Sequence, residues 1–426
     1  MLLLPIIFSG YHETHSLSLA RSRLRESRLS WQGHSVPETK LILHAPGWTV
    51  FDCLYMLNGT FYVVTNRPDV LPQAKFIIST GIDIANGEEA AVARLPTERV
   101  IRVISPAEAR SLFGTGANRI HGVTWLANDP SQFVRHYFHG SAELLLGFWR
   151  THSALDPLIP IDGTTRLSPP RRLIFTHIDA LHWRDYYMKN PYVLRTAFPS
   201  LVLEFSLDWN DRAAAGVPFV FDRVIIADRS AAMLGNGFMT SYRTASEPQA
   251  LPGSPYWWNS FRNNVVRSSG LDDKAEGSKP VITYIVREWR RRLRQEDHEH
   301  LVEELKRLET EHGYEVNIVK TLNMAPAEEV RLLGRSTIAL GVHGNGMTSL
   351  IWMDRTPQAT VLEFFYPGGF AYDYEYTARA LGISHVSFWG NITFSYPDLP
   401  PVAYPIGFQG NSIPVDATLV AKMIYD

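Results

Sequence analysis

The chain of 426 residues is too long for one ordinary hydrophobic core and is expected to fold as two domains. Apolar residues make up 45% and charged residues 20%, a composition that excludes both a disordered chain and a bundle of membrane helices. Because the formal net charge is only -2, the protein as a whole has no electrostatic attraction to nucleic acid or to an anionic membrane. The single cysteine, Cys53, excludes an intrachain disulfide and a cysteine-based zinc site.

The first residues, Met1 to Phe8, form an apolar segment that is far too short to span a bilayer and lacks a basic leader. We therefore expect either a soluble protein or a membrane anchor that lies outside this sequence.

Short apolar runs between turn signals predict strands throughout the first half of the chain. A helix with a broad apolar face is predicted between them, from His139 to Leu155. This half is therefore expected to be α/β. The predicted strands are Leu41–Leu43, Phe61–Val64, Lys75–Ser79, Val100–Ile104, Gly122–Ala127, Leu173–His177, Leu201–Phe205 and Val224–Ala227.

A composition change marks the predicted domain boundary. Between Leu251 and Lys279 the chain becomes rich in Pro, Gly, Ser, Asn and Asp, which is typical of a linker. We therefore expect an N-terminal lobe in residues 1–270 that binds the acceptor of the reaction inferred below, and a C-terminal Rossmann-like lobe in residues 271–426.

After this boundary, strands and helices are predicted to alternate, which implies a parallel doubly wound sheet with its ligand beyond the carboxyl ends of the strands. A last helix, Pro414–Asp426, is expected to pack back on the first lobe. The predicted strands are Val281–Val286, Tyr314–Val319, Thr337–Val342, Thr360–Phe365 and His385–Phe388, and the helices between them are Asp297–His312, Pro326–Arg335, Met347–Met353 and Tyr372–Leu381.

A short glycine-containing loop, His343-Gly344-Asn345-Gly346, lies between a predicted strand and the helix that follows it. Its two glycines let backbone N–H groups approach a ligand closely, and the N-terminus of the helix favours negative charge, so a diphosphate fits there. A turn that merely requires positive φ gives the same letters, so the loop alone leaves a purely structural interpretation open.

Two charged residues accompany this loop. Glu363 lies in an apolar strand, where an unpaired carboxylate is costly; it could accept both hydroxyls of a ribose, or form a structural ion pair with a buried arginine. Arg287 follows the first strand of this half and is predicted to bind phosphate oxygens. The arginines after it are expected to form mainly a solvated face, although Arg292 is also a candidate for donor binding.

The segments Tyr284-Ile285-Val286-Arg287, Gly341 to Thr348 and Val361-Leu362-Glu363 resemble the C-terminal signature of glycosyltransferase family 61, in particular its fungal members. The resemblance adds Met347 and Thr348 to the candidate donor site. It continues upstream through Trp48–Asp52 and Phe138–Gly147. Membership would imply a GT-B architecture, with two Rossmann-like lobes facing a cleft, a UDP-sugar donor, and inversion at the anomeric carbon.

An inverting transfer requires a general base for the acceptor hydroxyl. The resemblance places this base in the N-terminal lobe, four residues after a histidine, which corresponds here to Glu143 after His139. At this spacing both side chains share one helix face, so His139 is expected to orient Glu143 or to contact the acceptor. A solvated glutamate is the alternative, and Gly140 stands where the resemblance implies an aromatic residue.

The resemblance therefore implies an enzyme that transfers N-acetylglucosamine or a pentose from a UDP-sugar to a glycan or glycoprotein, with no further cofactor. The absence of an Asp-x-Asp motif predicts metal-independent transfer, and the resemblance implies residence in the Golgi or the ER lumen. One alternative is an inactive sugar- or nucleotide-binding protein. Another is an NAD-dependent oxidoreductase, which is disfavoured because Ser349 replaces the third glycine of the dinucleotide motif.

Overall fold

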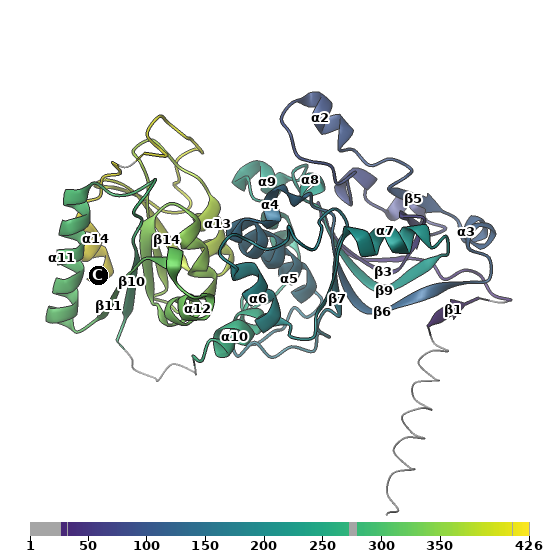
Figure 1. Ribbon diagram of the computed structural model, residues 1–426, viewed down its shortest axis with the longest axis horizontal. Coiled ribbons are helices and arrows are strands. Elements are labelled where there is room, and N and C mark those ends of the chain that lie inside the picture. Colours follow the sequence, from purple (N-terminus) through teal and green to yellow (C-terminus); the bar gives the residue numbers. More distant parts are fainter. Residues whose placement is uncertain (1–26, 32, 272–278, 411, 426) are drawn as a thin grey trace, which may run out of the picture.

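The computed structural model describes residues 27–31, 33–271, 279–410 and 412–425 of the chain. They form an elongated, mixed α/β molecule with one sheet near each end and a layer of helices between the sheets (Figure 1). The apolar segment Met1–Phe8 and linker residues 272–278 lie outside the described residues. Among the helices of the described ranges, none has the length and apolar character needed to cross a membrane.

The first sheet has nine strands in the described part of the chain, with the main order β5-β4-β3-β9-β6-β7-β8. Strand β6 pairs in parallel with β7 and β9, β7 with β8, and β4 with β5. Strand β3 is antiparallel to its neighbours, and β1 is antiparallel to β6. The strands are β1 Arg28–Ser30, β2 Lys40–Ala45, β3 Trp48–Leu57, β4 Thr60–Val64, β5 Ile101–Ile104, β6 Gly116–Ala127, β7 Arg172–Phe175, β8 Val202–Glu204 and β9 Phe219–Ala227.

The helices of the first half cover both faces of this sheet and extend towards the second sheet (Figure 1). They are η1 Pro68–Val70, η2 Ala74–Phe76, α2 Glu88–Ala93, α3 Pro106–Phe113, α4 Ser131–Val134, η3 Phe138–Leu145, α5 Leu146–Ser153, α6 Lys189–Ala197, α7 Ser206–Ala214, α8 Arg229–Ala232, α9 Asn236–Ser241, η4 Thr244–Ala250 and α10 Asn259–Ser268.

The second sheet has six strands among the described residues, in the order β11-β10-β12-β13-β14-β15. All its pairs are parallel except β14 with β15, so the parallel sheet predicted for this half is confirmed. Its elements are β10 Val281–Ile285, α11 Gln295–His312, β11 Glu315–Val319, η5 Thr321–Asn323, α12 Pro326–Arg335, β12 Ile338–Val342, η6 Asn345–Trp352, β13 Thr360–Phe364, α13 Asp373–Ala380, β14 Ser384–Trp389, β15 Ile392–Phe394 and α14 Ala417–Tyr425.

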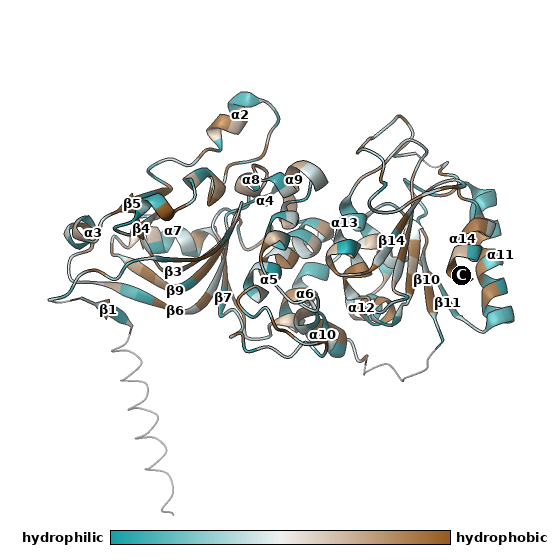
Figure 2. Ribbon diagram, turned by 180° about the vertical axis from the view of Figure 1, so that it is seen from behind, coloured by the Kyte–Doolittle hydropathy of each residue, from teal (hydrophilic) through white to brown (hydrophobic). Residues whose placement is uncertain are grey.

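One apolar cluster connects the two sheets. Because side chains alternate along a strand, Trp125 of β6 and Val361 of β13 face this shared cluster, whereas Leu126 and Leu362 face separate cores on the outer sides. The strands are hydrophobic along much of their length, although β6 and β9 also carry hydrophilic stretches, and the outermost helix α11 turns a hydrophilic face outwards (Figure 2). At the centre, the Trp258 indole N–H donates a hydrogen bond to the carbonyl of Ile351 at 2.8 Å, so the halves share a continuous interior.

One predicted strand and the predicted packing of the C-terminal helix are wrong. Residues 75–79 are not a strand: η2 occupies their start, and the backbone N–H of Ser79 donates to the Asp228 carboxylate at 2.6 Å instead of to a neighbouring strand. The C-terminal helix α14 does not pack on the first half. Its Val420 and Ile424 join Leu305 of α11 in the outer core of the second sheet, because α11 offers them a row of leucines at helical spacing.

Candidate functional site

The two predicted phosphate-binding elements meet at the carboxyl edge of the second sheet. Strand β10 lies between β11 and β12, so the connections that leave β10 and β12 run in opposite directions along the sheet. Such a reversal opens a crevice at the carboxyl ends of the strands. Arg287 follows β10 and Gly344 follows β12, which places both residues at this point.

Arg287 lies directly against Gly344. A β-carbon on residue 344 would stand 2.1 Å from an Nη atom of Arg287, and the φ of Gly344 is 151°, a value that side-chain-bearing residues rarely adopt. Glycine is therefore required here both for the backbone conformation and for the approach of the guanidinium group. The Arg287 Nε–H is fixed by the carbonyl of Arg290 at 3.1 Å.

A pocket of about 130 Å³ opens beside this pair. It is bounded by the loops after β10, β11 and β12 and by two residues of the first half, so both halves contribute to its wall. The predicted donor-site residues Arg287, Asn345 and Gly346 are among those that line it. The remaining lining residues are Tyr187, Lys189, Ile285, Val286, Glu288, Trp289, Lys320, Thr321 and Leu322.

Six predicted donor-site residues lie outside this lining: Gly344 just described, His343 and Glu363 described below, and Met347, Thr348 and Arg292. Met347 and Thr348 are 1% and 0% exposed within η6, a 3-10 helix where the sequence predicted a helix from Met347 to Met353. Arg292 is exposed, and its guanidinium donates to the carbonyl of Glu288 at 3.3 Å. Their proposed contacts with the donor remain predictions.

Glu363 is fully buried between two histidines. Its carboxyl oxygens lie 2.6 Å from His343 Nδ1 and 2.9 Å from His385 Nε2, so neither a ribose nor a buried arginine is needed to satisfy them. Burial raises the pKa of Glu363 well above its ordinary value and lowers the pKa of each histidine to about 3. Glu363, His343 and His385 therefore form an uncharged hydrogen-bonded group. The sequence interpretation did not identify His385 as a neighbour of Glu363.

Arg291 is a candidate functional residue that the sequence interpretation assigned to a solvated face. Its φ is 57°, and its buried Nε has no hydrogen-bond partner among the described residues. It affects the pKa of both His343 and His136, so it lies between the two halves. The sequence carries no clear signal for this residue, because the difference between the half-buried Arg291 and its exposed neighbours Arg290 and Arg292 arises only in the folded chain.

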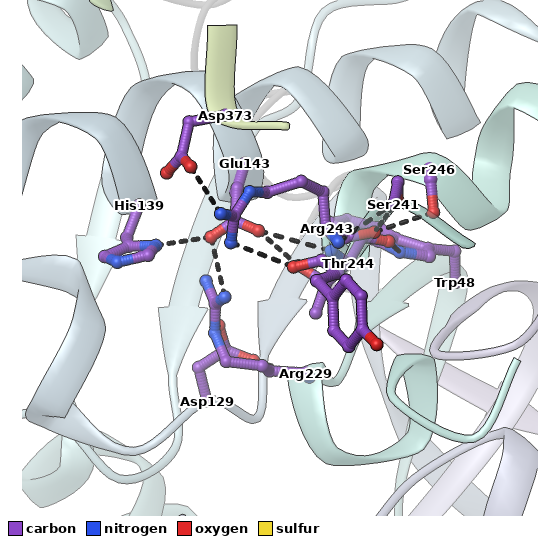
Figure 3. A network of polar contacts seen from close by, with 11 residues as sticks. Trp48, Asp129, His139, Glu143, Arg229, Ser241, Arg243, Thr244, Ser246 and Asp373 are labelled. Atoms are coloured by element: carbon purple, nitrogen blue, oxygen red, sulfur yellow. Dashed lines mark hydrogen bonds and ion pairs between the residues drawn. The ribbon is translucent and has the colours of Figure 1, made fainter. Parts of the chain in front are cut away.

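The predicted catalytic pair lies on η3, a π-helix that continues directly into α5, where the sequence predicted one helix from His139 to Leu155. π-Helical turns are rare in proteins, and those that occur are often found at functional sites. His139 Nδ1 and Glu143 Oε2 are 2.5 Å apart, as the four-residue spacing predicted (Figure 3).

Gly140 is explained by its surroundings. A β-carbon at this position would lie 2.2 Å from Nδ2 of Asn190. That amide donates to the carbonyl of Val134 at 2.9 Å and accepts from the hydroxyl of Ser141 at 2.8 Å. The side chain of Asn190 thus occupies the place of the aromatic residue that the resemblance implied and fixes the start of η3.

Glu143 is buried in a network of donors, not solvated. Its Oε2 accepts from His139 and from Arg229 at 2.8 Å, and its Oε1 accepts from the backbone N–H and the hydroxyl of Thr244 at 3.2 and 3.3 Å (Figure 3). Arg229 is held in turn by Asp129 at 3.3 Å. Burial opposes ionisation of Glu143, but Arg229, His139 and Arg243 outweigh it and hold the pKa of Glu143 well below its ordinary value.

The His139–Glu143 pair and the glycine loop are joined across the two halves. The ring of Phe138, next to His139, packs edge-on against Tyr374 at 5.4 Å, and Tyr374 lies 5.4 Å from the ring of His343. Beside these rings, Arg243 forms a 2.5 Å ion pair with Asp373 at the start of α13 (Figure 3). Residues predicted separately from the two halves therefore lie in one connected region.

Comparison with known proteins gives no relative: no protein-family model matches the chain, and no curated protein is significantly similar to it.

Proposed function

We propose that this protein is an inverting glycosyltransferase that moves N-acetylglucosamine or a pentose from a UDP-sugar to a hydroxyl group of a glycan or glycoprotein. One observation carries the proposal: a histidine–glutamate pair of the first half lies in the same region as an arginine–glycine loop of the second half, and Arg243 and Asp373 join them. Such a transfer requires both parts, a proton acceptor and a cationic site for the departing diphosphate.

The architecture we propose for this function is GT-B. The parallel strands of the second sheet present a crevice at their carboxyl edge. In the first half, β6, β7, β8 and β9 form a parallel group, with Asp129 in the loop after β6 and Arg229 at the start of α8 after β9. The donor would occupy the second half and the acceptor would approach along the first. We place such an enzyme in the Golgi or the ER lumen.

The donor site is supported by charge and shape. Arg287 and Arg291 supply two cations without an ion-pair partner among the described residues, and backbone amides at the start of η6 add further donors. The pocket of about 130 Å³ is smaller than the ~300 Å³ or more typical of sites for whole ligands. We therefore assign one ring of the nucleotide to this pocket and the diphosphate to the adjoining arginines.

The oxidoreductase alternative is less compatible with the site. A dinucleotide site requires an acidic side chain that is free to bind the ribose hydroxyls, whereas both oxygens of Glu363 are occupied by histidines and its exposure is 0%. The pseudoenzyme alternative shares the proposed binding site, so only turnover distinguishes it.

A thermal-shift screen tests the proposal. A ligand at a hundred times its dissociation constant stabilises its protein by about 2.7 kcal/mol, so UDP and its sugar conjugates should raise the melting temperature measurably. We expect no such shift with NAD. We also expect transfer to continue in EDTA, and complete loss that Mn²⁺ restores would overturn metal independence.

A further inference from the structure

The hydrogen bonds of Glu143 leave it no free site for a proton from an acceptor. A carboxylate offers about four lone-pair positions, and four donors reach this one: His139, Arg229, and the N–H and hydroxyl groups of Thr244. The side chain is 1% exposed. A substrate hydroxyl could reach Glu143 only if one of these bonds were first broken.

The same bonds fix the tautomer of His139. An ionised carboxylate only accepts hydrogen bonds, so the Nδ1 of His139 must carry the hydrogen that it shares with Glu143. In a neutral imidazole the lone pair then lies on Nε2. No described residue forms a hydrogen bond with Nε2, and the His139 side chain is 26% exposed.

The surroundings of His139 keep this orientation. The rings of Phe133 and Phe138 pack edge-on against the imidazole at 5.3 and 5.4 Å, and His136 lies 5.1 Å away. Behind Glu143, the Arg229–Asp129 pair prevents the carboxylate from turning. The imidazole is therefore held at Nδ1, while Nε2 has no hydrogen bond with a described residue.

We propose that His139 is the general base and that Glu143 is a positioning residue which holds its tautomer, the reverse of the roles implied by the sequence. This inference rests on the proposed glycosyl transfer. The acceptor O–H gives its proton to His139 Nε2 while its oxygen bonds to the anomeric carbon. The bond from that carbon to the diphosphate breaks, and its electron pair leaves with UDP. Glu143 stabilises the imidazolium that forms.

The test compares His139→Asn, His139→Ala and Glu143→Gln. Asparagine places an N–H near the position of Nδ1, so the bond to Glu143 and the fold are retained while Nε2 is lost. We expect kcat to fall at least about 100-fold in both histidine variants, with UDP affinity within about twofold of wild type. Added imidazole should restore part of the activity of His139→Ala, because that cavity opens to solvent. Glu143→Gln should retain more activity than either histidine variant.

The outcomes separate the inference from the function on which it rests. A wild-type protein that transfers sugar, together with an active His139→Asn or an imidazole-insensitive His139→Ala, would overturn the role of His139. The same holds if Glu143→Gln is the least active variant. A folded wild-type protein that binds no UDP compound and transfers no sugar would instead refute the proposed function.

Discussion

The guanidinium group of Arg287 occupies the space that a side chain on residue 344 would need, with an Nη atom 2.1 Å from the position of that β-carbon. The segment after β10 and the turn after β12 are thereby in close contact at the carboxyl edge of the second sheet. We propose that both residues together contribute to the phosphate site. The contact places a cation beside the backbone amides at the start of η6.

Gly344→Ala should therefore weaken UDP binding. The new methyl group displaces Arg287, and the φ of 151° strains the backbone by about 1–3 kcal/mol. We expect at least a tenfold loss of UDP affinity by calorimetry. Gly216→Ala is the matched control: its φ is 64° but no atom lies within 4 Å, so it should lose stability while UDP affinity is kept. Equal affinity in both variants would remove the Arg287–Gly344 contact from the site.

Arg291→Ala should affect binding more than folding. Its buried Nε has no hydrogen-bond partner among the described residues, so removing the side chain breaks no bond to that atom. A charge-assisted hydrogen bond to a diphosphate contributes about 1.5–3 kcal/mol, which corresponds to at least a tenfold change in the dissociation constant. Arg294→Ala, at an exposed position of the same segment, should leave UDP affinity unchanged. If the two variants bound UDP equally, Arg291 would belong to a solvated face after all.

Much of the second half could be predicted from the sequence, because its apolar strands and amphipathic helices alternate regularly. Pro326 begins and Arg335 ends α12 as predicted. The first half was harder. The long strand β3 follows no clean alternation, and the chain at Ser79 is extended without pairing because the Asp228 side chain satisfies its N–H. The conformation of such segments depends on hydrogen bonds with side chains that are far away in the sequence.

The candidate site shows the same limit. The four-residue spacing predicted the contact between His139 and Glu143, since both lie on one continuous helix. It could not predict Arg229 or Thr244, which lie 86 and 101 residues from Glu143 in the sequence. Their hydrogen bonds occupy the carboxylate that the sequence suggested as the base. Spacing identifies neighbours on one element, whereas protonation depends on the whole surrounding shell.

Trp258→Ala should destabilise both halves together. The indole is 4% exposed, stacks on Phe261 with ring centroids 4.4 Å apart, and bonds the Ile351 carbonyl of the other half. Truncation of such a side chain costs about 3–5 kcal/mol. We expect a single urea transition at lower concentration, while Leu158→Ala, at a side chain 86% exposed, should shift it little. Two separate transitions in the wild-type protein would contradict a shared core.

The free energy of unfolding should decrease as the pH is lowered, because His152 is buried in its neutral form. This side chain is 1% exposed, and burial lowers its pKa to about 3. The unfolded chain binds a proton near pH 6.5 and the folded one does not, so stability is full above that pH and declines as the pH falls towards 3. At pH 5 the loss from this group is about 2 kcal/mol.

His152→Phe is the comparison for that measurement, because it keeps an aromatic ring beside Trp125 and removes the titration. Other buried histidines contribute equally to both proteins. The difference in unfolding free energy between wild type and variant should therefore shift by about 2 kcal/mol between pH 7 and pH 5. A constant difference would mean that His152 becomes protonated without unfolding.

The proposed activity is sugar transfer from a UDP donor at the joint site of the two halves. Mass spectrometry of glycan and glycopeptide acceptors, after incubation with UDP-N-acetylglucosamine or a UDP-pentose, measures it directly. We predict the addition of a single sugar by the wild-type protein and its loss in Arg287→Ala with the fold retained. A folded wild-type protein that transfers no sugar from any UDP donor, and is stabilised by NAD instead, would contradict the proposed glycosyl transfer.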